Sequence, residues 1–250
     1  DVTVAQTVSD AKGEYSVDYL RAGEYTVRVT LPDGMVFTCV GESAIAALDN
    51  TVGSTASITV AMGESISNLT VGAIVPASVS GRIYVDADEN GLEDAQDSPL
   101  SGAMLTLMQG GTVVATCETD DSGMYAFGAI RPDKYRIRVT LPDHTLFARD
   151  SVLSLAHPDA VEGETRSFEL EMGDTVALES IGTVRAASIS GCAWSDENAN
   201  GRMDAHEPAL HGTVAELISL NEYGDALVAA AVTVDEDGRY AFGLLRSGEY

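Results

Sequence analysis

The chain has 250 residues, more than one typical domain needs, so its length suits two or three modules. Its 39 acidic residues outnumber its 14 lysines and arginines, giving a formal net charge of −25. This balance excludes a nucleic-acid-binding surface and docking on anionic membranes. No apolar run approaches the roughly 20 residues of a membrane helix, so direct membrane insertion is not expected. The hydrophobic fraction of 45% is typical of a folded protein.

The sequence repeats itself at a spacing of about 110 residues. Residues 25–32 (YTVRVTLP) match residues 135–142 (YRIRVTLP), and the Gly-x-Tyr-x-Phe pattern ending at Phe127 returns at Phe242. We therefore expect the C-terminal part of a first repeat at 1–77, a complete repeat at 78–187 and the N-terminal part of a third repeat at 188–250. On this interpretation, the chain is a window from a longer array.

Short strands are predicted along each repeat. In these segments apolar residues alternate with polar residues, and turn-forming residues separate one segment from the next. The predicted strands lie at 25–31, 83–85, 103–108, 112–117, 124–127, 135–141, 167–172 and 176–181. Residues 43–48 and 152–157 are each long enough for only a single helical turn. Seven or eight short strands in about 110 residues indicate an all-β sandwich.

Two acidic loops, 86–97 and 196–207, share one pattern. Each has oxygen-bearing side chains at positions 1, 3, 5, 9 and 12 and glycine at position 6, which is the spacing of a twelve-residue calcium loop. The predicted Ca²⁺ ligands are side chains at these positions and the backbone carbonyl at position 7. They are Asp86, Asp88, Asn90, Leu92, Asp94 and Asp97, then Asp196, Asn198, Asn200, Arg202, Asp204 and Glu207.

A strand precedes each loop and proline follows it, which excludes the paired helices of a calcium sensor. The alternative is a solvated turn that binds no ion. A second acidic turn precedes each Gly-x-Tyr pattern, with Asp10, Asp120 and Asp235 at equivalent positions. These residues either cap a turn or belong to a second calcium site.

Residues 9–12 (SDAK) match the Ser-x-x-Lys string of serine acyl-enzymes, but the equivalent residues 119–122 and 234–237 identify the segment as a turn. Other common catalytic motifs do not occur in the sequence, so we expect no enzymatic activity. The cysteines Cys39, Cys117 and Cys192 occupy positions that are not equivalent in the repeat, so they predict no shared disulfide framework. Cys117 lies on a predicted strand, where we expect a buried and inert thiol.

The combined motifs, in residues 79–97, 99–107, 119–127 and 135–142, resemble the B domains of serine–aspartate-repeat surface adhesins. That resemblance implies tandem immunoglobulin-like, prealbumin-like β-sandwiches that bind Ca²⁺ through the two acidic loops. It also implies an extracellular location on a bacterial surface. Related modules often contain a Lys–Asn crosslink. Here the only lysines, Lys12 and Lys134, both lie at turns, so calcium is the expected reinforcement.

The favoured function is therefore a calcium-stabilised stalk whose partners are the neighbouring repeats of the same chain. One alternative is a sandwich that binds a host protein or glycan, which predicts a solvent-facing aromatic cluster. The other is an accessory prealbumin-like domain of an extracellular enzyme, which requires a catalytic domain elsewhere in the protein.

Overall fold

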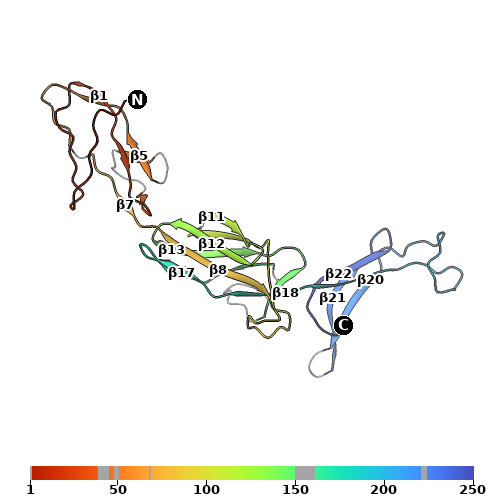
Figure 1. The fold of residues 1–250 in the computed structure, drawn as a ribbon. Helices are drawn as coiled ribbons and strands as arrows, with labels where there is room; N and C mark the ends of the chain where they lie inside the picture. The colour runs from red at the N-terminus through yellow and green to blue at the C-terminus, as the bar shows by residue number, and fades with distance from the viewer. Residues whose placement is uncertain (1, 39–44, 48–50, 68, 150–160, 221–223) are drawn as a thin grey trace. The chain divides into compact units, whose positions relative to one another are not determined.

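The computed structural model describes residues 2–38, 45–47, 51–67, 69–149, 161–220 and 224–250. Within these ranges the regular secondary structure is entirely β, which confirms the predicted all-β class (Figure 1). No helix with the length and apolar character to cross a membrane occurs in the described ranges. The chain forms two compact units, Asp1–Ala77 and Ser78–Tyr250.

The part of the first unit that the structure describes forms three small sheets. Its strands are β1 (Gly23–Tyr25), β2 (Arg28–Thr30), β3 (Val36–Phe37), β4 (Ile45–Ala47), β5 (Val52–Thr55), β6 (Ile58–Val60) and β7 (Ala73–Ile74). β1 pairs with β6, β2 and β4 pair with β5, and β3 pairs with β7, all antiparallel. The predicted strand at 25–31 is thus interrupted, because β1 and β2 belong to different sheets.

The first part of the second unit contains two larger sheets. Its strands are β8 (Ala77–Val85), β9 (Ser98–Pro99), β10 (Met104–Gln109), β11 (Thr112–Glu118), β12 (Met124–Ile130), β13 (Asp133–Thr140), β14 (Thr145–Phe147), β15 (Glu162–Glu164), β16 (Phe168–Leu170), β17 (Thr175–Ala177) and β18 (Ile181–Arg185). One sheet has the order β11-β10-β13-β15, with β16 also on β13. The other has the order β12-β8-β18-β14, with β9 and β17 also on β8.

Residues 78–187 bury a core between these sheets. On β13, Tyr135, Ile137 and Val139 are at most 3% exposed, which confirms the predicted alternation. Leu105 on β10 and Ile83 on β8 are fully buried and contribute to the same core from the two sheets. The side chains of both sheets therefore pack as in a sandwich.

The described residues of 187–250 form four strands: β19 (Ala187–Cys192), β20 (Val214–Leu220), β21 (Ala226–Thr233) and β22 (Arg239–Leu245). β19 pairs with β22, and β20 pairs with β21. Some positions that are core in the middle repeat are exposed here, although Leu217 and Phe242 stay buried like their counterparts Leu107 and Phe127. Ile189 is 40% exposed where its counterpart Val79 is 1% exposed, because the described residues of 188–250 form no strand that corresponds to β13 or β18.

Two further details of the secondary-structure prediction are wrong. Residues 176–181 do not form one strand, because β17 and β18 are separate strands that pair with different parts of β8. Residues 45–47, inside the expected helical turn at 43–48, form strand β4 beside β5. The other expected helical turn, 152–157, lies outside the described residues. The division between the second and third repeats, after residue 187, stays a prediction.

Candidate metal site

The first acidic loop connects β8 to β9, which pair side by side. Asp86 begins the loop and is only 2% exposed. Its Oδ1 accepts a hydrogen bond from the Asn90 backbone amide at 3.1 Å, and its Oδ2 accepts one from Gly91 at 2.8 Å. Gly91 has φ of 77°, a conformation that glycine adopts without strain. The first carboxylate therefore folds the loop around itself.

The last acid closes the loop from its other end. Asp97 Oδ1 accepts a hydrogen bond from the Ala87 amide at 2.9 Å, and Asp97 Oδ2 accepts one from the Asp94 amide at 2.9 Å. Positions 1 and 12 thus each bind two backbone amides. These hydrogen bonds hold the loop in its conformation without an ion. An ion would therefore bind to a site that is already formed.

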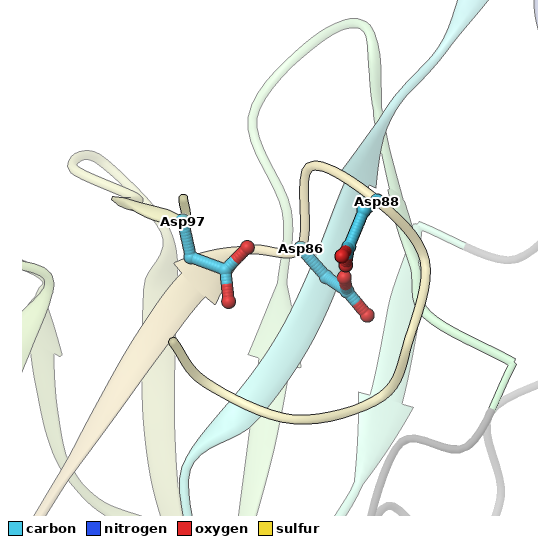
Figure 2. A group of neighbouring side chains, drawn as sticks. All are labelled: Asp86, Asp88 and Asp97. Carbon is cyan, nitrogen blue, oxygen red and sulfur yellow. The ribbon is translucent and has the colours of Figure 1, made fainter. Parts of the chain in front are cut away.

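Three carboxylates converge inside this loop (Figure 2). Oxygens of Asp86, Asp88 and Asp97 lie within 4.8 Å of one another. Asp86 is buried, Asp97 is partly exposed and Asp88 is exposed. Three negative charges this close repel each other, and a hard cation between them would remove the repulsion. The described residues therefore include an acidic triad that could bind a metal ion.

The negative charge of the loop affects the pKa of Tyr84 on the neighbouring strand. Burial raises the pKa of Tyr84, and the negative charges of Asp86, Asp97 and Glu93 raise it further, in that order. Tyr84 is the next-to-last residue of β8, where the acidic loop begins. The phenol therefore stays neutral beside the carboxylates.

Other predicted ligands of this loop are not in the triad. The Asn90 amide points its Nδ2 group at Asp88 Oδ2 and Asp94 Oδ2, 3.1 and 3.2 Å away. Its Oδ1 instead accepts the Leu92 backbone amide at 2.7 Å. Coordination of a cation by Asn90 therefore requires the amide to turn, because only its oxygen can bind a cation. Ligation by Asn90, Asp94 and the Leu92 carbonyl stays a prediction.

The second acidic loop repeats the hydrogen bonds of the first. Asp196 accepts the backbone amides of Asn200 and Gly201 at 3.1 and 2.8 Å, and Glu207 accepts those of Glu197 and Asp204 at 3.2 and 3.0 Å. The shared spacing thus encodes a shared loop conformation.

The acids of this second loop are arranged differently from those of the first. Among the described residues, Asp196, Asp204 and Glu207 do not form a converging acidic group like the one at Asp86. Glu207 is buried at 7% exposed, whereas Asp196 is exposed. Ligation by these acids, by Asn198 and Asn200 and by the Arg202 carbonyl stays a prediction.

The equivalent acids Asp10, Asp120 and Asp235 cap turns. In each, Oδ1 accepts backbone amides from the residues two and four positions later, at 2.7 to 3.0 Å. These are Asx-turn hydrogen bonds that start a tight connection between strands. This geometry supports the turn interpretation of these acids.

Two repeated features escaped the sequence analysis. The hydroxyls of Tyr25, Tyr135 and Tyr250 each donate to the backbone carbonyl of the arginine four residues earlier, at 2.7, 2.9 and 3.2 Å. This is a tyrosine corner, a known device of β-sandwiches. The repeated Arg-x-x-x-Tyr spacing at Arg21, Arg131 and Arg246 was the available signal.

The second feature is an aromatic ring lying on a glycine. A Cβ added to Gly81 would lie 2.3 Å from the Tyr125 hydroxyl, and one added to Gly191 would lie 2.5 Å from the Tyr240 hydroxyl. The repeated Ser-Gly and Gly-x-Tyr patterns therefore form one contact between β8 and β12, and again between β19 and β22.

The cysteines differ from expectation in their exposure. Cys117 lies on β11 as predicted but is only half-buried, and Cys192 is exposed; both are free thiols. Burial raises the pKa of the Cys117 thiol, and a hydrogen bond from the Ala126 backbone opposes that shift. Cys39 lies outside the described residues.

Comparison with known proteins gives matches over most of the chain. Serine-aspartate repeat-containing protein F of Staphylococcus epidermidis is 26% identical over 99% of this chain. Serine-aspartate repeat-containing protein E of Staphylococcus aureus is 28% identical over the whole chain. Colossin-A of Dictyostelium discoideum is 29% identical over 97% of it. The chain spans only 14%, 22% and 2% of the length of these relatives, respectively.

Solved structures with detectable similarity are distant. A streptococcal ancillary pilin has 12% sequence identity and a TM-score of 0.33, over 89% of this chain and 87% of the pilin. The Bacillus anthracis TIE protein has 14% identity and a TM-score of 0.32, over 89% of this chain and 44% of that protein.

The family match is much more extensive. The SdrD B-like domain family matches residues 1–73, 77–178 and 187–250, three segments that leave few residues uncovered. Together with the two-sheet fold and the twice-repeated acidic loop, this match shows that the chain belongs to the SdrD B-like domain family.

Proposed function

We propose that this chain is a series of structural spacer modules stiffened by Ca²⁺ bound in the acidic loops. The single observation that carries the proposal is the convergence of Asp86, Asp88 and Asp97, with oxygens within 4.8 Å of one another. Carboxylate oxygens are the donors that Ca²⁺ prefers, and Ca²⁺ takes six to eight of them at about 2.3–2.6 Å. Backbone carbonyls, the turned Asn90 amide and water would complete the shell.

The mechanism is a crosslink within one module. The loop joins β8 to β9, and their pairing ends at Val85 and Ser98, next to the first and last acids of the loop. An ion held by Asp86 and Asp97 would tie the two ends of the loop together. Binding that favours the folded state raises stability by mass action. The bound charge would also offset part of the self-repulsion of a chain with net charge −25.

The cellular setting belongs to the same proposal. Staphylococcal serine-aspartate repeat-containing proteins are among the relatives of the chain, and the family model covers nearly all of it. We infer an extracellular role on a bacterial surface, with the neighbouring repeats as the partners in direct contact. Millimolar extracellular calcium would be needed, since extracellular modules bind at about 0.1–1 mM.

Calorimetric unfolding of the full chain tests the proposal. We expect calcium at ten times its dissociation constant to stabilise a module by about 1.4 kcal/mol, a rise in midpoint of about 4–8 °C relative to chelator. The double variant Asp86→Asn with Asp88→Asn should lose this rise in the transition of the middle repeat. The readout is the calcium-dependent difference within each variant, because Asp86 also accepts backbone amides and its replacement lowers stability without any ion.

The matched control removes two charges elsewhere. Asp33→Asn with Asp143→Asn changes equivalent, exposed residues in the Leu-Pro-Asp turns of the first and second repeats. This control should keep the full calcium response. An unchanged midpoint at 10 mM calcium in the unmodified chain would identify the acidic loop as a solvated turn and defeat the proposal.

A further inference from the structure

An arginine crosses from the C-terminal repeat into the middle repeat. Arg246 is only 7% exposed, although arginine side chains are almost never fully buried unless they are paired. Its Nη2 donates a hydrogen bond of 2.7 Å to the backbone carbonyl of Phe147, which is itself completely buried at the end of β14. Both residues belong to the second compact unit.

Equivalent arginines in the other repeats are not buried. Arg21, Arg131 and Arg246 all lie four residues before the tyrosine of a tyrosine corner. Arg21 and Arg131 are exposed. The corner therefore does not require a buried arginine, and the burial of Arg246 reflects its contact with the middle repeat.

The following residue makes a second contact across the same junction. Ser247 Oγ donates a short hydrogen bond to Oε1 of Glu89, the fourth residue of the first acidic loop. Ser247 also lines the hollow formed by Asp86, Asp88 and Glu89. Two adjacent residues of one turn thus bind two separate segments of the middle repeat, the end of β14 and the acidic loop.

The connection between the two repeats is short. β18 ends at Arg185 and β19 begins at Ala187, so only residue 186 separates the last strand of one repeat from the first strand of the next. A linker of one residue limits the orientations that the two repeats can take relative to each other. Separation of the contact would also break the hydrogen bond from Arg246 to the Phe147 carbonyl.

We propose that Arg246 and Ser247 form a docking turn that seats the C-terminal repeat on the acidic-loop end of the middle repeat. The partner surface is the Phe147 carbonyl together with Glu89. The docking turn fixes the orientation of the two repeats relative to each other, and it does so without an ion in the loop. Its failure is therefore separable from failure of the calcium proposal.

Nuclear magnetic relaxation of the full chain in chelator tests the docking turn. We expect the amides of 78–185 and 188–250 to report one common tumbling time in the unmodified chain. Arg246→Ala should release the C-terminal repeat, whose tumbling time then falls roughly twofold, toward that of a separate small domain. The matched control is Arg131→Ala, which removes the equivalent but exposed arginine and should leave the common tumbling time unchanged.

Two results would overturn the proposal: a common tumbling time that survives Arg246→Ala, or an equal loss in Arg131→Ala. A second measurement needs no variant and covers the case in which Arg246→Ala unfolds residues 188–250. Residual dipolar couplings of the unmodified chain should fit a single alignment tensor for 78–185 and 188–250. Two independent tensors would show freely jointed repeats and exclude the docking turn.

Discussion

At the scale of single residues, the most unusual side chain of the core is Tyr125. It is 3% exposed, and its hydroxyl is buried without a hydrogen-bond partner among the described residues. Burial raises the pKa of this phenol, and the neighbouring Cys117 raises it further. The folded state therefore resists the loss of the Tyr125 proton, whereas the unfolded state releases it near the ordinary pKa of about 10.

This difference predicts a specific alkaline instability. Above pH 10 the unfolded chain binds fewer protons than the folded chain, so the free energy of unfolding falls as pH rises. Tyr125→Phe should reduce that fall by up to about 1.4 kcal/mol per pH unit, and it should be neutral or stabilising at pH 7, because no hydrogen bond is lost. Urea unfolding midpoints at pH 7, 9 and 10.5 measure the effect.

The control for this variant is Tyr19→Phe, since Tyr19 is fully exposed. It should keep the alkaline decline of the unmodified chain, to which the buried Tyr84 and Tyr135 and the half-buried Cys117 also contribute with raised pKa values. Identical declines in both variants would contradict the assignment of the effect to Tyr125.

Individual loop residues were predictable only in part. Spacing alone identified positions 1, 3, 5, 9 and 12, and the two loops do share their backbone hydrogen bonds. Which acids converge was not encoded in spacing, because the first loop brings Asp86, Asp88 and Asp97 together while Asp94 accepts the Asn90 amide instead. Such details depend on side-chain rotation, which a pattern of residue types does not record.

At the scale of elements, strands with a fully buried face were the most predictable. β13 alternates between core and exterior, and that alternation is visible in its sequence. The segment 176–181 (VALESI) was misread as one strand. A pattern of apolar and polar residues cannot indicate where a chain leaves one stretch of a partner strand and pairs with another. Here β17 and β18 both run parallel to β8 but pair with different segments of it, Ser78–Ser80 and Ile83–Val85.

The contact between β8 and β12 leaves no room for a side chain at Gly81. Gly81→Ala would place a Cβ 2.3 Å from the Tyr125 hydroxyl and 2.5 Å from its Cζ, so the buried ring must shift. Overpacking of a core usually costs about 1–3 kcal/mol, and we expect a loss in that range for the middle repeat. Urea unfolding of the full chain measures it.

Gly128→Ala is the matched control, because Gly128 lies on β12 and an added Cβ there meets nothing within 4 Å. This variant should change stability by no more than about 0.5 kcal/mol, as exposed substitutions usually do. A Gly81→Ala variant as stable as Gly128→Ala would show that the ring does not lie on the glycine in solution.

At the scale of the whole molecule, self-similarity predicts the order of the repeats, whereas no pattern in the sequence predicts the contact at the junction. Arg131 and Arg246 have the same place in the repeat pattern, and sequence gives no reason why one is exposed and the other buried. The difference arises from tertiary contact with Phe147. The burial of this arginine thus depends on contact with the neighbouring repeat and not on the sequence of its own repeat alone.

The two proposals meet at the first acidic loop, because Glu89 contacts Ser247 while Asp86 and Asp88 on either side belong to the acidic triad. Any ion that orders this loop should therefore stabilise the docking turn, and linkage requires the docking turn to strengthen ion binding equally. One lost hydrogen bond is worth about 1 kcal/mol, so Arg246→Ala should weaken calcium binding by at most about fivefold, the value if that hydrogen bond is fully coupled to the ion.

A calcium titration followed by the amide shifts of residues 86–97 measures this affinity, with Arg131→Ala as the control. Equal affinities in the two variants would mean that loop and junction act independently, and stiffness of the array would then depend on docking alone. A weaker affinity confined to Arg246→Ala would make this junction a calcium-dependent joint. The flexibility between 78–185 and 188–250 would then follow extracellular calcium over the range in which the loop fills.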